Sequence, residues 1–374
     1  MRVLFTMPKG LGHVFPLVST AHALMGAGHD VLFATADAER AARAGLTCVD
    51  VAPPGIDSVY YDFMRERGVG FDLGMTGPDS DIGLYAEMFA AVSDALTDRA
   101  VTAALAWRPD LVVHTPSQGA GPLLAARLGV PAVEHGIGPG ELPGLDAALF
   151  THLSPAYRRH GLTGPPPPPA ARLTVAPPSL SGPGPSDLVM RYVPYNGGGH
   201  LPAWLLTPPP RPRIAVTLGT VLPLFGGLKP LRRLAESAAR HDLELVLATG
   251  DASPDGLGPV PQNVRVAGWV PLGPLLRTCA ALVHHGGSGT TMTGLVAGVP
   301  QLIMPSGADQ FTGAEAVRAR GAGHVAALDD LDIGRVRDLL DDEATRKAAL
   351  DVRDEITRLP SPADLVNNLL DLLT

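Results

Sequence analysis

The stretch at residues 280–305 reads AALVHHGGSGTTMTGLVAGVPQLIMP. Its two ends are short apolar runs, which predict buried strands, and a glycine-rich loop opens the apolar segment 292–297, which predicts a helix. Two strands joined by a helix form the unit from which parallel sheets are built. The stretch therefore predicts an α/β fold with a parallel sheet.

The same alternation recurs along the rest of the chain. Residues 3–7 form an apolar run, followed by a Pro/Gly loop, an apolar periodic stretch at 14–25 and another run at 30–35. Further buried strands are expected at 109–113, 130–134, 213–220, 243–250, 263–269 and 299–305. These signals predict two doubly wound domains, one in each half.

The composition changes sharply between the two halves. It is rich in Pro, Gly and Ser from the polyproline run at 165–169, a surface loop or stiff spacer, to the Pro/Arg run at 208–213. We place the domain boundary near residue 200. The predicted segments are 1–200, 201–356 and a last apolar helix within 357–374.

Length and composition exclude several classes of protein. With 374 residues, 45% of them hydrophobic, the chain can bury two cores. A formal charge of −8 disfavours nucleic acid and anionic membrane as partners. No apolar run is long enough to insert into a membrane, and the N-terminus lacks signal-peptide character. Cys48 and Cys279 have no metal-site spacing, so we expect a cytoplasmic protein.

The glycine-rich loop is the sharpest chemical signal. His285, Gly287, Ser288, Gly289 and Thr290 lie where a strand ends and a helix begins. Glycines let the backbone approach an anion, and a helix start offers unpaired N–H groups. The loop lacks the lysine of a P-loop, so ATP hydrolysis of that kind is disfavoured. We interpret it as a phosphate site; a tight turn into a buried helix is the alternative.

A histidine follows the first strand. Gly10, Gly12 and His13 begin a loop in which Phe15 occupies the third-glycine position, so a dinucleotide site is a weak interpretation. A histidine at the carboxyl end of a strand suits general base catalysis, because its ordinary pKa lies near neutrality. Capping of the first helix is the alternative.

Two further loops at the same sheet edge carry polar or aromatic groups. Asp309 and Gln310 suit sugar hydroxyls, because together they accept and donate hydrogen bonds; a simple helix cap is the alternative. Trp269 offers a flat face for a nucleobase, and the backbone of Val270 offers hydrogen bonds to the base edge. A core tryptophan is the alternative there.

Taken together, these motifs resemble the family 1 glycosyltransferases of GT-B fold, especially the actinobacterial enzymes that decorate polyketide and macrolide-type natural products. The resemblance implies two Rossmann-like domains facing a cleft, with an acceptor-binding domain at 1–200, a nucleotide-sugar-binding domain at 201–356 and a last helix packing back on the first domain. It rests on matching motifs in order at 12–16, 23–35, 191–199, 217–220, 268–276, 284–305 and 309–323.

The resemblance also implies an activity. The expected reaction is the inverting, metal-independent transfer of a deoxysugar from a nucleotide diphosphate to an apolar aromatic or polyketide acceptor, and it needs no cofactor. The resemblance leaves open whether the protein is a homodimer. His13 would be the base. The donor would be bound as follows: its diphosphate by Thr220, His285, Gly287 and Thr290, with Ser288 and Gly289 in the same loop, its base by Trp269 and Val270, and its sugar by Asp309 and Gln310.

The sequence departs from the family at one point. Many relatives have an Asp after the fourth strand to orient the histidine, whereas this chain has no carboxylate after its strand at 109–113. Ser117 or Glu134 are the candidates to replace it. Because the carboxylate is absent, a non-catalytic nucleotide-sugar-binding helper protein remains an alternative, as does a sugar-nucleotide epimerase.

Three further expectations concern metal, donor and acceptor. Two DxD motifs, at 79–81 and 330–332, are interpreted as solvated loops and not as metal sites.

Thr293 stands where plant relatives have a Glu that accepts hydrogen bonds from ribose hydroxyls. The absence of that carboxylate favours thymidine diphosphate as the donor nucleotide. An aromatic acceptor pocket is predicted in the first domain from Tyr60, Tyr61, Phe63, Phe71, Tyr85 and Phe89, which could also be core.

Overall fold

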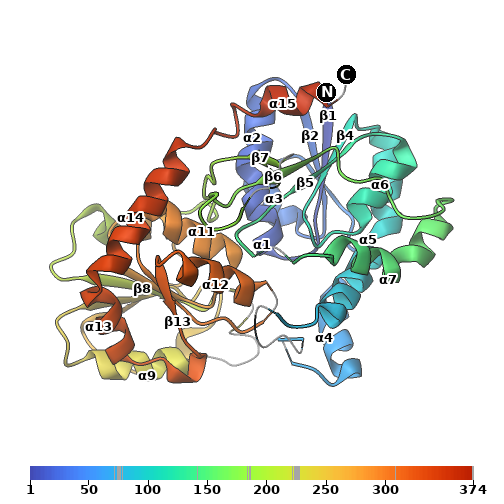
Figure 1. Ribbon diagram of the computed structural model, residues 1–374. Helices are drawn as coiled ribbons and strands as arrows, with labels where there is room; N and C mark the ends of the chain where they lie inside the picture. Colours follow the sequence, from blue (N-terminus) through green and yellow to red (C-terminus); the bar gives the residue numbers. More distant parts are fainter. Residues whose placement is uncertain are drawn as a thin grey trace.

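The computed structural model describes residues 1–70, 72–73, 77, 79–140, 142–182, 184, 187–220, 222, 228–307 and 309–372. They form two parallel sheets with helices on both faces, which confirms the expected pair of Rossmann-like domains (Figure 1). The first sheet has the order β3-β2-β1-β4-β5-β6-β7 and the second β10-β9-β8-β11-β12-β13. Both orders reverse beside the first strand, and ligands bind α/β sheets at such switch points.

The first domain is built from seven strands and the helices between them. Its strands are β1 (Arg2–Thr6), β2 (Asp30–Thr35), β3 (Cys48–Asp50), β4 (Leu111–His114), β5 (Ala132–His135), β6 (Ala171–Thr174) and β7 (Asp187–Val189). Its helices are α1 (Leu11–Val14), η1 (Phe15–Leu17), α2 (Val18–Gly26), α3 (Ala38–Arg43), α4 (Ile56–Arg67), α5 (Gly83–Trp107), α6 (Ala120–Leu128) and α7 (Leu145–Arg159).

The second domain repeats this arrangement. Its strands are β8 (Arg213–Thr217), β9 (Glu244–Leu247), β10 (Val264–Val266), β11 (Ala281–His284), β12 (Gln301–Ile303) and β13 (Gly323–Val325). Its helices are η2 (Ala203–Leu206), α9 (Lys229–Ala238), η3 (Pro254–Leu257), α10 (Leu272–Leu276), α11 (Ser288–Ala297), α12 (Gln310–Ala319), η4 (Leu328–Asp330), α13 (Ile333–Asp341) and α14 (Glu343–Arg358). The last helix, α15 (Val366–Asp371), packs on the first domain.

Alternation along the strands determines which helices cover which face. Val3 and Phe5 of β1 pack on the face covered by α2, whereas Leu4 packs against α5 and α6 on the other face. The cluster beneath α2 continues into the second domain through Met292 of α11 and Val352 of α14. The two domains therefore share one apolar core.

The structure differs from the expected elements in one place. The helix expected at 14–25 is divided into α1, η1 and α2 around Pro16, whose ring lacks an N–H group. The polyproline run at 165–169 is a surface loop without helix or strand, one of the two expected alternatives, and β6 and β7 after it complete the first sheet. The boundary predicted near residue 200 lies between β7 and β8 and remains a prediction.

The C-terminal segment crosses back to the first domain. Figure 1 shows α14 running along the second domain and α15 lying over the first, near β1 and α2. The N–H of Arg191 donates to the carbonyl of Pro360 at 2.7 Å, and Leu365, Val366 and Leu369 join the shared apolar core. We call residues 190–212, between β7 and β8, the connector. The C-terminal segment thereby fixes one end of it.

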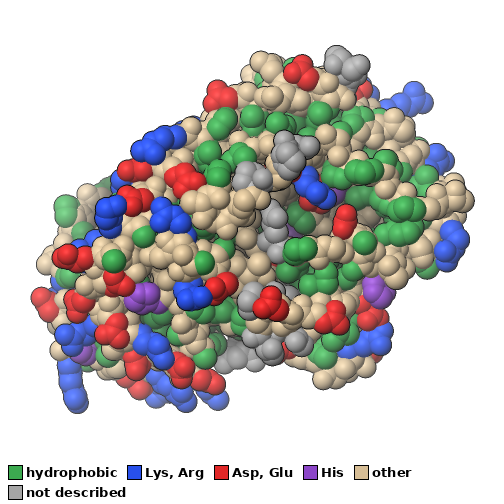
Figure 2. Space-filling view, in the orientation of Figure 1, with side chains coloured by type: hydrophobic (Ala, Val, Ile, Leu, Met, Phe, Trp, Pro, Cys, Tyr) green, Lys and Arg blue, Asp and Glu red, His purple; other side chains and the backbone are tan. Residues whose placement is uncertain are grey.

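The surface agrees with the charge balance. Figure 2 shows acidic and basic side chains interspersed over α9, α13 and α14, with no single-sign patch on that face. The part of this face that Figure 2 colours by residue type therefore shows no basic stripe of the kind that nucleic-acid-binding proteins carry. Among the described residues, no helix combines the length and apolarity needed to cross a bilayer.

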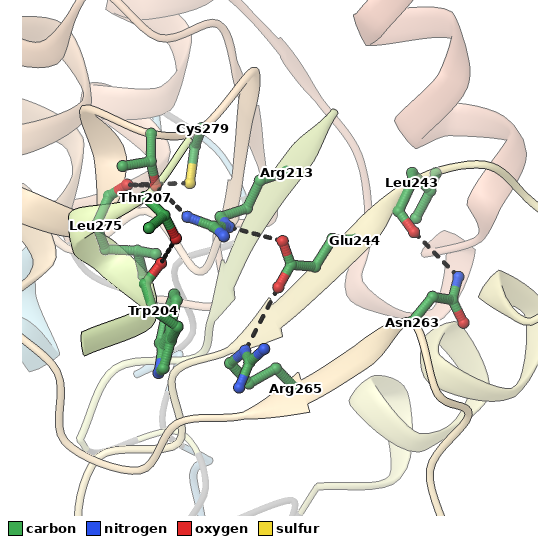
Figure 3. Close-up of polar contacts among 10 residues, drawn as sticks. Trp204, Thr207, Arg213, Leu243, Glu244, Asn263, Arg265, Leu275 and Cys279 are labelled. Atoms are coloured by element: carbon green, nitrogen blue, oxygen red, sulfur yellow. Dashed lines mark hydrogen bonds and ion pairs between the residues drawn. The ribbon is translucent and has the colours of Figure 1, made fainter. Parts of the chain in front are cut away.

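A buried ion pair anchors the other end of the connector. Arg213 Nε donates to Glu244 at 2.9 Å, and Arg265 Nε donates to the other carboxylate oxygen at 3.4 Å (Figure 3). Trp204 of the connector lies 5.0 and 4.6 Å from the two guanidinium carbons. Because Arg213 is only 3% exposed, water cannot solvate its charge, and the carboxylate of Glu244 compensates it instead.

We expect Glu244→Ala to lower the free energy of unfolding of the second domain by about 3–5 kcal/mol, because it leaves Arg213 buried and unpaired. The matched control is Glu236→Ala, which breaks the exposed pair with Arg232 on α9 and is expected to cost less than about 1 kcal/mol. Denaturant titration of both variants checks this. Equal losses would show that the buried pair does not anchor the connector.

Candidate donor and acceptor site

The start of helix α11 provides unpaired backbone donors. Gly287 is its N-cap residue, and its carbonyl accepts from Thr290 and Thr291 at 3.0 and 2.9 Å. The N–H groups of Ser288 and Gly289 donate to no acceptor within the described part of the chain. With the helix dipole, these groups form a site for an anion.

His285 is held beside this helix start by two glycines. A Cβ on Gly219 would lie 2.4 Å from the imidazole, and one on Gly287 would lie 2.5 Å from it. Gly219 also has a φ of +69°, which favours glycine. Burial lowers the pKa of His285 to about 4, so the ring is neutral at pH 7 and offers one N–H.

The neighbouring His284 has a structural role. Its Nε2 lies 2.8 Å from Gln301 Oε1, and its Nδ1 accepts from the N–H of Gly286 at 3.1 Å. Burial lowers the pKa of His284 to about 3. His284 therefore packs in the protein interior while His285 lines the cavity, because successive residues of an extended segment point to opposite sides.

One cavity brings together most of the predicted donor residues. It lies between the domains and includes Leu11, Gly12 and Phe15 from the first domain. The predicted donor residues that line it are Thr220, Trp269, Val270, His285, Gly287, Ser288, Gly289 and Thr290. The carboxyl ends of β1 and β8 thus face each other across a single space.

Asp309 and Gln310 lie in different surroundings. Asp309 lines a second cavity with Tyr85 and Ser117 of the first domain, and it accepts from Ser288 Oγ at 2.8 Å. Burial raises the pKa of Asp309, opposed by that hydrogen bond. Gln310 lines neither cavity, because its Oε1 accepts from the N–H of Ser306 at 2.9 Å. The structure does not place Gln310 with the other predicted donor residues.

His13 lies at the beginning of the first helical segment, next to Gly12 of the shared cavity. Its Nδ1 is buried and has no partner in the described part of the chain, and the Phe89 ring lies edge-on at 5.6 Å. Burial lowers the pKa of His13 to about 4. His13 is therefore a neutral imidazole whose ring is positioned by packing.

Neither residue suggested as the partner of His13 contacts it. Ser117 exchanges a hydrogen bond with Tyr85 at 2.9 Å, and Glu134 accepts from Arg172 at 3.1 Å. Both expectations were wrong, because each side chain already has a nearer partner. No carboxylate in the described residues bonds to His13.

Only part of the predicted aromatic group lies beside His13. Phe89 packs against Tyr85 at 4.5 Å and Tyr60 at 6.2 Å, and the Tyr60 hydroxyl donates to the carbonyl of Lys9. Tyr61 is 46% exposed. Phe63 instead packs under the Arg67 guanidinium, and Phe71 lies outside the described residues. Tyr60, Tyr85 and Phe89 thus form an aromatic wall near the histidine.

The connector supplies site residues that the sequence did not reveal. Tyr192, Tyr195 and Asn196 line the shared cavity. From the sequence, the motif at 191–199 indicates only a family match near the domain boundary. Its aromatic and amide side chains are the signal that could have placed it in a binding site. A connector between two sheets necessarily passes the cleft between them.

Asn196 also changes the interpretation of Thr293. Thr293 is 1% exposed and does not line the cavity; its hydroxyl donates to the carbonyl of Gly289 at 2.6 Å. Asn196 Nδ2 donates to that hydroxyl at 3.1 Å, and Asn196 Oδ1 accepts from the N–H of Gly273 at 3.0 Å. The expectation that position 293 meets the ribose was wrong, because Asn196 covers it.

An ion pair joins the domains next to Trp269. Arg40 of α3 contacts Asp251 of the second domain at 2.6 Å, and its guanidinium carbon lies 5.3 Å from the centre of the Trp269 ring. Phe15 approaches the same ring edge-on at 6.4 Å. Residues of the first domain thereby help to fix the indole at the cavity wall.

Three of the four carboxylates of the DxD motifs have protein partners. Asp332 caps α13 by accepting from the N–H of Arg335 at 2.9 Å, and Asp330 pairs with the Arg335 side chain at 3.6 Å. Asp81 accepts from the N–H of Gly83 at 2.9 Å. In the described ranges, no three His, Cys, Asp or Glu side chains form a metal-binding group.

Two parallel α/β domains that share a cavity have the architecture of GT-B glycosyltransferases, and the helix start beside the glycine-flanked histidine is suited to an anion such as a diphosphate. The family models described as erythromycin biosynthesis protein CIII-like, N-terminal and C-terminal domains, match residues 22–219 and 232–372. The chain belongs to this family of natural-product glycosyltransferases and is an enzyme of that kind.

Characterised relatives match over nearly their whole length. Elloramycin glycosyltransferase ElmGT of Streptomyces olivaceus is 41% identical, with 99% of this chain and 97% of the relative covered. The crystal structure of SnogD from Streptomyces nogalater is 44% identical, with a TM-score of 0.88 and both chains fully covered. SsfS6 from Streptomyces sp. SF2575, complexed with thymidine diphosphate, is 30% identical, with a TM-score of 0.83 and 99% of each chain covered. These enzymes support neither the helper nor the epimerase alternative.

We expect Gly219→Ala to displace the His285 ring and to reduce both nucleoside diphosphate affinity and turnover at least about tenfold, because the added Cβ overlaps the imidazole. Gly45→Ala is the matched control: its φ is +78°, but nothing lies within 4 Å of the added Cβ. Both variants carry the same backbone strain. Calorimetric titration and turnover assays should therefore show a loss only at position 219; equal losses would contradict the role of the glycine.

Proposed function

We propose that this glycosyltransferase transfers a deoxysugar from thymidine diphosphate to an aromatic or polyketide acceptor, with inversion at the anomeric carbon and without a metal ion. The observation that carries the proposal is the shared cavity, in which the α11 start and His285 face Gly12, the neighbour of His13. A donor in this cavity has its diphosphate on the second domain and its sugar directed to the first.

The second domain stabilises the leaving diphosphate. Negative charge accumulates on the phosphate oxygens as the bond to the sugar breaks. The N–H groups of Ser288 and Gly289, the imidazole of His285 and the hydroxyl of Thr290 are hydrogen-bond donors for that charge. They are fixed before the reaction, so little reorganisation is needed. Asp309, in the adjoining cavity, is the candidate for the sugar hydroxyls.

His13 is the proposed base. Its imidazole is neutral at pH 7 and takes the proton of the acceptor hydroxyl as the oxygen attacks the anomeric carbon. Without a carboxylate on Nδ1, the imidazolium that forms has no adjacent anion to stabilise it. This favours acidic acceptor hydroxyls such as phenols, and the wall of Tyr60, Tyr85 and Phe89 fits a planar aromatic acceptor.

The choice of donor is supported by the relatives. SsfS6 and the spinosyn rhamnosyltransferase SpnG were crystallised with thymidine diphosphate, and a relative from Streptomyces peucetius is named TDP-daunosamine transferase. In this chain the amide of Asn196 lies at the cavity wall in place of a carboxylate. A carboxylate at this wall would accept a hydrogen bond from the 2′-hydroxyl of a ribose. A deoxyribose has no 2′-hydroxyl, so a neutral amide meets its smaller demand.

For the donor, we expect thymidine diphosphate to bind more tightly than uridine diphosphate in calorimetric titrations. Transfer from a thymidine diphosphate deoxysugar to an anthraquinone-type phenol should continue in excess chelator, because the diphosphate is met by N–H and O–H donors. Stereochemical analysis of the product should show inversion. Tighter binding of the uridine nucleotide would contradict the donor assignment, and chelator-dependent loss restored by Mg²⁺ would contradict the metal-free mechanism.

For the base, we expect His13→Ala to lower turnover by roughly 10²–10⁴ while leaving thymidine diphosphate affinity nearly unchanged. In the wild type, kcat/KM should be flat from about pH 5.5 to 8 and should fall only as the pH approaches about 4, where His13 becomes protonated and can no longer accept a proton. His152→Ala, a substitution on α7 outside both cavities, is the control. Normal turnover of His13→Ala with both phenol and aliphatic alcohol acceptors would rule out His13 as the base.

A further inference from the structure

The connector places an unpartnered hydroxyl in the wall of the shared cavity. Tyr192 is 2% exposed, and its phenolic oxygen has no hydrogen-bond partner in the described part of the chain. Buried tyrosine hydroxyls nearly always have a partner, and each exception needs a reason. Because Tyr192 also lines the cavity, its missing partner can be a ligand.

The hydroxyl faces the first turn of α11. A Cβ built on Gly289 would lie 3.6 Å from the Tyr192 oxygen. Gly289 and Ser288 are the residues whose N–H groups have no protein acceptor, at the positive end of a helix of ten residues. The phenol and the two amides are therefore neighbouring donors at the same part of the cavity.

Packing holds the Tyr192 ring in this position. The ring belongs to the apolar core that joins the two domains, together with Met190 and Met292. The backbone on its N-terminal side is fixed, because Met190 donates to the carbonyl of Thr174 at 2.8 Å and Arg191 donates to that of Pro360 at 2.7 Å. The hydroxyl cannot withdraw from the cavity without disturbing that core.

The protonation state of Tyr192 makes it a donor. Burial raises the pKa of its phenol well above the ordinary value, so the hydroxyl keeps its proton throughout the neutral range. A phenol that keeps its proton can donate it in a hydrogen bond. Beside the N–H groups of a helix start, such a donor suits an oxygen anion.

We propose that the Tyr192 hydroxyl donates a hydrogen bond to an oxygen of the donor's diphosphate, alongside the N–H groups of Ser288 and Gly289. This inference rests on the proposed function, because it takes the cavity to bind a nucleoside diphosphate. It makes the connector part of the donor site. A residue packed in the core shared by the two domains then also contacts the donor.

Tyr192→Phe tests the proposal, because it keeps the ring and removes only the hydroxyl. Calorimetric titration with thymidine, thymidine monophosphate and thymidine diphosphate separates the phosphate contacts from the rest. We expect diphosphate affinity to fall about tenfold or more, as for a hydrogen bond to a charged group, and thymidine affinity to stay within about twofold. The melting temperature of the free protein should stay equal or rise, because an unpaired buried hydroxyl is removed.

The control is Tyr157→Phe, a buried tyrosine of α7 that packs on Phe150 and lines neither cavity. It should change no nucleotide affinity. A loss shared by the monophosphate assigns the contact to the first phosphate, and a loss confined to the diphosphate assigns it to the second; both support the proposal. Unchanged diphosphate affinity, or an equal loss for thymidine, overturns the role of Tyr192 alone. Failure of the wild type to bind any nucleotide overturns the proposed function as well.

Discussion

The site depends on the close packing of His285 between Gly219 and Gly287. Gly219 follows β8 and Gly287 precedes α11, so on these two sides the imidazole packs against backbone and not against side chains that could change rotamer. The ring is therefore fixed beside the free N–H groups of the helix start. Because two parallel strands deliver these segments to the same sheet edge, the arrangement follows from the topology of the second sheet.

The two domains are held together so that this edge faces the first sheet. The connector is fixed near Arg191 by the C-terminal segment and near Trp204 by the Arg213–Glu244 pair. Between these anchors it passes along the cavity and contributes Tyr192, Tyr195 and Asn196. Helix α15 and the shared apolar core join the domains from the other side. Donor site and domain junction are therefore built from the same residues.

Three of the buried polar atoms that lack a hydrogen-bond partner in the described chain belong to residues in or beside the shared cavity. His284 and Gln310 both have protein partners, and both are directed away from the shared cavity. The buried Nδ1 atoms of His13 and His285 and the hydroxyl of Tyr192 have none in the described chain. Leaving polar atoms unpaired destabilises the protein, so these positions are the ones where a ligand adds most.

The sequence by itself determined the two α/β domains, most of their central strands, the glycine-rich loop and the family, because apolar runs and glycine-rich turns act over a few neighbouring residues. The short strands β3, β6, β7 and β13 were missed, since pairing with a neighbouring strand defines them more than their own pattern does. Only the tertiary structure decided which polar side chains are already engaged. Ser117 is engaged by Tyr85, and Thr293 by Asn196, which is 97 positions away in the chain. Such pairings depend on how distant elements pack, and no local pattern specifies them.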